Sequence, residues 1–179
     1  MSYIVPSEEL TLTDKKQLRN EALEAGIARA LKLGLASSRE GLIAREPENI
    51  ADFGTAADQW LTAALTAVGT LFTVFNNIAT PTLANNKLVV FYKVGVETAP
   101  SPVSLLWFQL GAAAGTTKAV FDLEQLVNHL VVEGYFNEPV VYDPTNVLNV
   151  RVTCRILTNL QARVQLGGFL VEPRGQVIS

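Results

Sequence analysis

The amino-acid sequence predicts a mainly β protein, an antiparallel β-sandwich of the jelly-roll kind with an N-terminal amphipathic helix and one short helix. Residues 147–157 alternate strictly between apolar and polar side chains, the pattern of a strand with one buried face. Residues 163–171 and 87–97 repeat this period of two. About seven strand segments with only two helical ones are typical of a sandwich.

The composition indicates a protein whose surface is partly covered by other protein. The chain has 179 residues, enough for one domain with a substantial core. Charged residues make up 17% of it, against roughly 25% in an ordinary soluble domain. Residues 59–86 and 98–117 contain no charge, but neither stretch has about 20 consecutive apolar residues, so no membrane-spanning helix is expected.

Two further features of the composition restrict the partners and the compartment. The net charge is −3, and no run of Lys or Arg is long enough to neutralise several phosphates in a row, which argues against a nucleic-acid partner. The first ten residues lack the basic and apolar segments of a secretory signal, so synthesis in the cytoplasm is expected.

Residues 1–56 are predicted to form a helix and an extended arm, ahead of a sandwich domain over residues 57–179. Thr13 is the predicted N-cap of a helix from about residue 14 to residue 33, with Gly34 as its stop. The apolar side of this helix either packs on the chain's own sandwich or docks on a neighbouring copy. The polar, irregular arm has four apolar anchors: Leu42, Ile43, Ile50 and Phe53.

The strands expected after the arm cover residues 70–78, 87–97, 103–110, 116–121, 135–142, 147–157 and 163–171. One face of the second strand is expected to carry Leu88, Val90, Tyr92, Val94 and Val96. The third is apolar on both faces, which calls for cover on both sides. Asp122 is expected to cap a short helix that ends at Gly134, and Pro139 restricts the next strand to an edge, a strand start or a bulge.

The last two strands are predicted to form an antiparallel hairpin. The favoured register places Arg155 opposite Gln165 and Arg151 opposite Phe169, because the alternative would set Arg155 against Arg163. The three arginines then project from one wet face, which is either solvated or meets an acidic surface of another subunit.

Glycines and aromatic residues in this region allow other interpretations. The Gly167–Gly168 pair predicts a bulge, a close backbone approach, or room for a bulky neighbour such as Trp107. Trp107, Tyr135 and Tyr142 could stack on a sugar. The alternative function is therefore a β-sandwich binding module that recognises a glycan or a host surface.

No catalytic or metal-binding constellation is evident, so neither enzyme activity nor a cofactor or metal is expected. His129 is the only histidine, and no recognisable motif marks a Ser or Cys nucleophile to partner it. Cys154 is the only cysteine, and it lies on the apolar side of its strand. Asp143, Asn146 and Asn149 match the spacing of no calcium-binding loop and are better explained as turn residues.

Three sequence phrases resemble head and cement proteins of bacteriophage particles: ANNKLVVFYKVGVE, FDLEQLVNHLVVEGYFNEPVVY and VQLGGFLVEPRGQVIS. The resemblance covers about residues 70–179. It implies a non-enzymatic capsid cement or decoration protein, made in the host cytoplasm and located in the virion. Its implied partners are copies of itself, as a homo-oligomer, and other capsid proteins, whose neighbouring subunits it bridges.

Candidate interface residues come from the helix, the arm, the last two strands and the C-terminal tail: Leu18, Leu23, Ile27, Leu42, Ile43, Arg151, Arg155, Arg163, Phe169, Val177 and Ile178.

Overall fold

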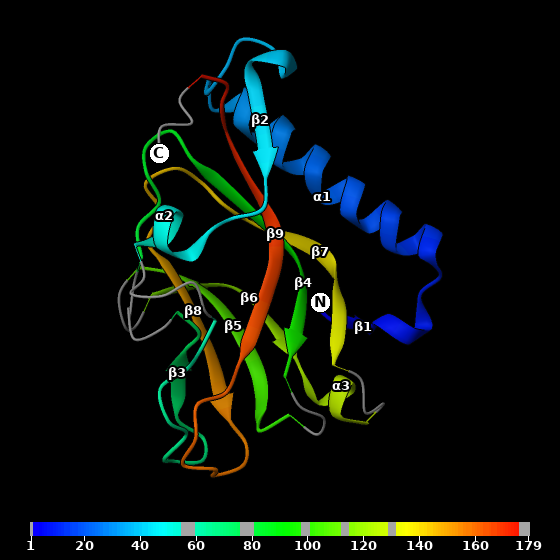
Figure 1. Cartoon of the computed structure of the whole chain (residues 1–179), viewed down its shortest axis with the longest axis vertical. Coiled ribbons are helices and arrows are strands. Elements are labelled where there is room, and N and C mark those ends of the chain that lie inside the picture. The colour runs from blue at the N-terminus through cyan, green and yellow to red at the C-terminus, as the bar shows by residue number, and fades with distance from the viewer. Residues whose placement is uncertain are drawn as a thin grey trace.

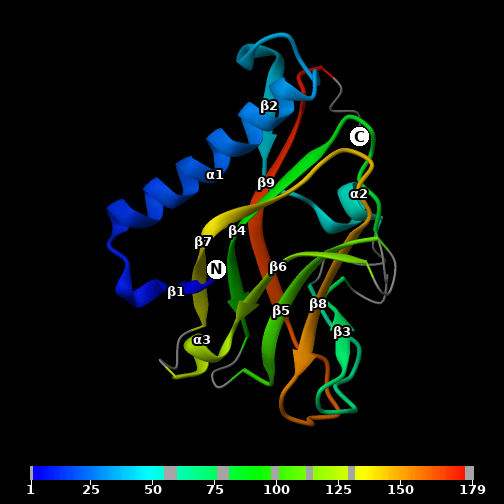
Figure 2. The same ribbon diagram turned by 180° about the vertical axis from the view of Figure 1, so that it is seen from behind.

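The computed structural model describes residues 2–54, 60–75, 81–97, 101–111, 115–128 and 132–175. Two antiparallel sheets pack face to face, and the long helix α1 (Leu12–Lys32) lies across the outer face of the larger sheet (Figures 1 and 2). The predicted mainly β sandwich with an N-terminal helix is confirmed.

The larger sheet has the order β1 (Ile4–Pro6), β7 (Glu133–Tyr142), β4 (Leu88–Val96), β9 (Val164–Pro173) and β2 (Leu42–Arg45). The smaller has the order β3 (Leu71–Thr73), β8 (Leu148–Cys154), β5 (Val103–Leu110) and β6 (Thr116–Asp122). The short helices are α2 (Asn49–Phe53) and α3 (Glu124–Asn128), and single 3₁₀ turns cover Ser7–Glu9 and Arg39–Gly41.

Eight of the strands follow a jelly-roll topology. β5 pairs with β6, β4 with β7, β3 with β8 and β2 with β9, all antiparallel. These nested pairs describe one long hairpin that is rolled up, so that successive pairs fall alternately in the two sheets. β4–β9 and β5–β8 contacts then complete each sheet. β1 adds a short strand beside β7.

The predicted hairpin between β8 and β9 is wrong. The two strands lie in opposite sheets, and residues 155–163 cross from one sheet to the other. Arg151 faces Trp107 and Thr73, while Phe169 faces Val90. The apolar alternation fits both arrangements, because a strand buries one face whether its sequence neighbour lies beside it or across the core.

The predicted face of β4 is correct only as far as Tyr92. Leu88, Val90 and Tyr92 point towards α1, but Val94 points into the core between the sheets. A β-bulge explains the change, since Phe91 and Lys93 face the consecutive residues Gly168 and Gly167 and leave Tyr92 as the extra residue.

The Gly167–Gly168 pair lies at this bulge, as predicted. A Cβ atom on Gly168 would overlap the carbonyl oxygen of Val90, so the two backbones approach each other too closely for any side chain. Trp107 does not use the space, because it lies on the smaller sheet.

Helix α1 begins two residues earlier than predicted. Thr11, not Thr13, is the N-cap: its hydroxyl accepts a bond from the Asp14 backbone N–H, and the Asp14 carboxylate accepts one from the Thr11 N–H. Gly34 ends the helix with a φ of 74° as expected, and the Leu35 N–H bonds back to the Ala30 carbonyl.

The apolar side of α1 packs on its own sheet. Ala22, Ile27 and Ala30 are buried against β4 and β9. Gly26 allows the close approach, since a Cβ atom there would lie 2.8 Å from Cγ2 of Val90. The larger sheet is therefore covered on both faces, and β4 is buried over most of its length.

The arm also belongs to the larger sheet. β2 pairs with β9, and Leu42 and Phe53 are buried, whereas Ile50 is exposed and Ile43 is half-buried. The Glu46–Pro47 step follows β2, and α2 ends at Gly54 with a φ of 67°.

Of the remaining strand predictions, those for β4 to β7 are confirmed to within two residues at each end. β3 covers part of the predicted 70–78 segment, of which residues 76–78 lie outside the described residues. Pro139 lies at an irregularity in the β4–β7 register, as expected. Gly134 does not end a helix, since it lies inside β7, where Ile4 and Leu126 pack against it.

Trp107 lies on the outer face of β5, for which cover was predicted. Trp107 is half-buried and donates its indole N–H to the Thr153 hydroxyl at 2.9 Å. No described helix lies over this face of the smaller sheet.

Candidate functional site

The candidate interface residues of the helix and of its sheet are largely used within the chain. Ile27, Leu42 and Phe169 are buried in the core between α1 and the larger sheet. Leu18 and Leu23 are half-buried and pack against the same core. The apolar side of α1 is thus occupied by the chain's own sheet.

The three candidate arginines do not share one face, because the predicted hairpin does not form. Arg151 lies on the outer face of β8, and its Nε donates to Oε1 of Gln109 at 3.1 Å. Arg155 is exposed and lies 3.8 Å from Glu124. Arg163 is exposed just before β9, in the other sheet. Val177, Ile178 and His129 lie outside the described residues.

The aromatic residues proposed for sugar stacking are not available for it as a group. Tyr142 is fully buried and donates its hydroxyl to the Gln109 carbonyl, and Tyr135 is also buried. Burial raises the pKa of Tyr142. Burial, together with nearby Glu133, raises the pKa of Tyr135 to about 12. Both side chains are part of the cores.

Asp143, Asn146 and Asn149 have structural roles. The Asp143 N–H bonds to the Asn146 side chain in the predicted turn, and Asn149 is buried in β8. The carboxylate of Asp143 accepts two bonds from Arg29 of α1, which lowers its pKa. This pair ties the helix to the end of β7.

A charge cluster, formed by Arg45, Asp52, Lys87 and Glu172, joins β2, α2, β9 and the residue before β4. Asp52 of α2 is completely buried and accepts two bonds of 2.7 Å from the Arg45 guanidinium and one of 2.7 Å from Lys87 Nζ. Glu172 of β9, also buried, accepts from Arg45 Nε at 2.9 Å. Two cations thus face two carboxylates, and the charges cancel.

The cluster holds the arm against the sheet. Burial would raise the pKa of Asp52, but the bonds from Arg45, Lys87 and the Glu48 backbone N–H outweigh burial and lower it. The bonds from Asp52 in turn raise the pKa of Arg45. Sequence reasoning missed this cluster, because its members lie 7 to 127 residues from Arg45 and no local pattern connects them.

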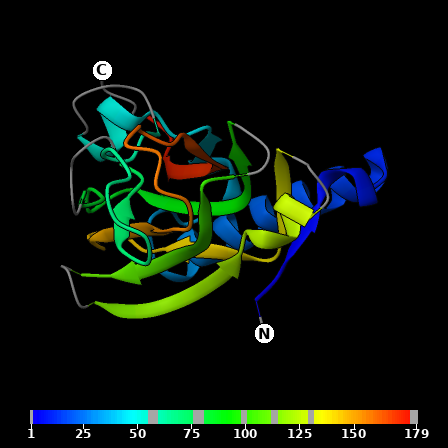
Figure 3. The same ribbon diagram turned by 90° about the horizontal axis from the view of Figure 1, so that it is seen from below.

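The most unusual surface is one end of the sandwich, which we call the tip: residues 63–70, 101–103 and 156–162. It lies at the bottom of Figure 1 and faces the viewer in Figure 3, where the loop before β3 runs beside the loop between β8 and β9. No residue of the tip is charged.

Four large aliphatic side chains are exposed at the tip. The exposed fractions are 63% for Val68, 44% for Ile156, 49% for Leu157 and 68% for Leu160. Among the described residues, nine large apolar side chains are exposed, so this small region carries almost half of them. A cluster of this kind marks an interaction surface more often than scattered apolar residues do.

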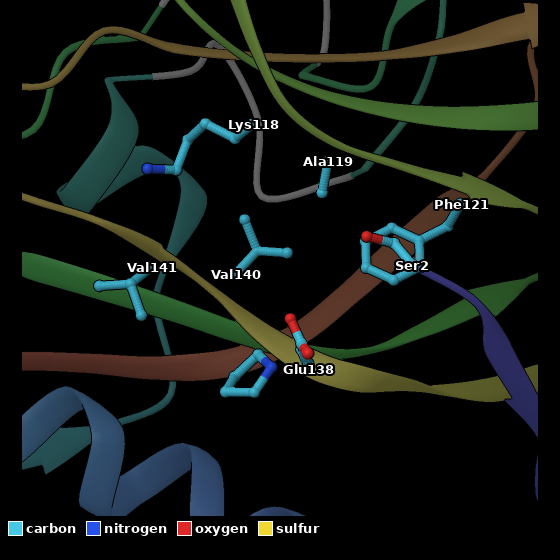
Figure 4. Close-up of a pocket in the computed structure, with 8 residues that line it drawn as sticks. Ser2, Lys118, Ala119, Phe121, Glu138, Val140 and Val141 are labelled. Carbon is cyan, nitrogen blue, oxygen red and sulfur yellow. The ribbon is translucent and has the colours of Figure 1, made fainter.

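A pocket of about 250 Å³ lies where β6 approaches β7 (Figure 4). Its described lining is apolar apart from Ser2, Lys118 and Glu138. The ammonium of Lys118 lies 5.5 Å from the centre of the Tyr142 ring, within range of a cation–π contact. The pocket has no group of side chains arranged for catalysis.

Among the described residues, no three His, Cys, Asp or Glu side chains are grouped as metal ligands. Within the same part of the chain, no helix has the length and hydrophobicity needed to cross a bilayer. No protein-family model matches the chain, and no curated protein matches it at a significant level of similarity.

Proposed function

We propose that this protein is a structural component of a virus particle, a capsid cement or decoration protein that self-associates and bridges neighbouring subunits of the shell. The observation that carries the proposal is the jelly-roll topology with its four nested strand pairs. Viral capsid proteins use this architecture, as do lectins and cupins.

Because one architecture serves several functions, the choice among them rests on the surface and the sequence. The low charge and the exposed aliphatic tip favour assembly with other protein. The three phrases that resemble phage head and cement proteins favour a virion. The burial of Tyr135 and Tyr142 disfavours the sugar-stacking alternative.

The structure also suits a mechanical role. Both faces of the larger sheet are covered, the arm is fastened by the charge cluster, and α1 is tied to β7 through Arg29 and Asp143.

The test combines solution mass with binding to shells. Light scattering on the purified full-length chain should give a mass at a multiple of 19.4 kDa. The chain should also co-sediment with emptied capsids of its own virus and raise the temperature at which they open. A monodisperse monomer that neither sediments with these capsids nor stabilises them would refute the proposal. Specific binding on a glycan array would favour the alternative.

A further inference from the structure

Self-association needs a surface, and neither the outer face of the larger sheet nor the strand edges provide a favourable one. α1 covers the outer face of the larger sheet. Three of the four edge strands, β1, β2 and β3, are only three or four residues long. Short edges offer few free backbone groups to a neighbouring strand.

The fourth edge, β6, is longer but is interrupted. Its pairing with β5 passes from Ala119 to Thr117, which leaves Lys118 as a bulged residue. Lys118 is also exposed and charged. A bulge and a lysine on an edge strand both oppose the addition of another strand. Strand addition is therefore disfavoured at every edge of the described sheets.

The tip differs from these surfaces, because backbone hydrogen bonds hold its segments together while its aliphatic side chains are exposed. The Leu65 N–H bonds to the Leu160 carbonyl at 3.0 Å, and the Asn159 N–H bonds to the Leu65 carbonyl at 3.1 Å. The Ile156 N–H bonds to the Pro102 carbonyl at 3.1 Å. These bonds join the three tip segments, while the buried side chain of Leu65 anchors them. The exposed aliphatic side chains are thus held in place before any partner binds, which reduces the entropy cost of association.

The charged residues next to the tip, which we call its rim, indicate what kind of partner binds there. Arg155, which lies 3.8 Å from Glu124, and Arg163, which is bonded to Glu97 through the backbone, adjoin the tip segments. The rim thus has two charges of each sign beside an uncharged centre. A strongly basic or strongly acidic partner would find no surface of opposite charge here. A second copy would, because about a two-fold axis an arginine of each copy can pair with a glutamate of the other.

We propose that the tip is the contact surface between two copies of this chain, with the exposed aliphatic residues at its centre and the Arg and Glu residues at its rim. This inference rests on the proposed self-associating function and names the surface that performs it. Its arrangement matches the apolar centre and polar rim of protein interfaces.

Leu160 and Leu12 form a matched pair for the test, because they are 68% and 70% exposed and only Leu160 lies in the tip. Leu160→Asp should weaken self-association at least about tenfold, as expected for a central interface residue. Leu12→Asp should leave it unchanged. Sedimentation equilibrium over a range of concentrations measures both, and circular dichroism checks the fold. If Leu160→Asp misfolds, Val68→Asp provides the same test.

The inference would be overturned if the Leu160→Asp chain associated as strongly as wild type. It would also be overturned if Leu160→Asp and Leu12→Asp weakened association equally. Wild-type chains that bind capsids yet stay monomeric at every concentration would also overturn it. They would refute the self-association in the proposed function as well, while decoration of the shell would stand. Wild-type chains that associate through the tip but never bind capsids would support the inference and refute the proposed function.

Discussion

Replacing Asp52 by asparagine tests whether the charge cluster stabilises the fold. The change keeps the size of the side chain but removes its charge, and it leaves Arg45 and Lys87 with Glu172 as their remaining carboxylate in the cluster. Lys87 Nζ lies 3.9 Å from Glu172, too far for a hydrogen bond, so Glu172 compensates poorly.

Breaking a buried ion pair by removing one partner typically costs about 3–5 kcal/mol. The side chains of Arg45 and Lys87 are 29% and 18% exposed, so water can partly solvate them once Asp52 is neutral. We therefore expect the lower end, about 3 kcal/mol of unfolding free energy. For a chain of this size the melting temperature should fall by about 6–12 °C.

Urea unfolding at pH 7, followed by circular dichroism, measures the loss. Glu24→Gln is the matched control, because it also removes one carboxylate charge. Glu24 accepts two hydrogen bonds from Arg39, but both side chains are more than half exposed. It should leave the unfolding midpoint close to wild type. Equal midpoints for Asp52→Asn and Glu24→Gln would refute the argument that burial makes this cluster stabilising.

The wild-type and Asp52→Asn proteins also give a prediction for the dependence of stability on pH. The folded pKa of Asp52 is lowered, so its contribution is fully present above the unfolded pKa of about 3.9 and is lost as the pH falls through the folded value. The stability difference between wild type and Asp52→Asn should be constant near neutral pH and should shrink below about pH 4. A difference that persists unchanged at lower pH would show that the loss of the Asp52 charge does not cause the effect.

Two further pairs of substitutions test the bulge and the helix cap. Gly168→Ala should lower the unfolding free energy by about 3 kcal/mol or prevent folding, because the Val90 carbonyl cannot move away from the new Cβ atom. Gly167→Ala should cost less, because its Cβ atom meets only the flexible Lys93 side chain. Equal losses of stability in urea unfolding would contradict this. Thr11→Ala should lower the unfolding free energy by about 1 kcal/mol, because it removes the N-cap, and Thr13→Ala should leave it nearly unchanged. Thermal melts in which Thr13→Ala is the less stable variant would indicate that Thr13 is the cap.

Part of the candidate site could be predicted from the sequence. The low share of charged residues predicted a surface covered by other protein, and the charge-free stretches 59–86 and 98–117 supply two of the three tip segments. Their meeting point could not be predicted, because residues 156–162 belong to the β8–β9 crossing that local alternation presents as a hairpin loop. The charge cluster was equally hidden, since its members meet only through the packing of four separate segments.

The sequence by itself determined the strands from β3 to β9, the N-terminal helix and the mainly β class, because side-chain alternation and helix-ending residues act over a few neighbouring positions. It did not predict β1 and β2, which are short and lie in segments without a clear alternation. Only the tertiary structure decided which strands pair, where the β4 face changes and what covers the apolar side of α1. Pairing in a jelly roll joins strands as distant as β2 and β9, and a single extra residue at Tyr92 reverses the faces that follow it. Such choices depend on contacts between distant segments, which no local pattern records.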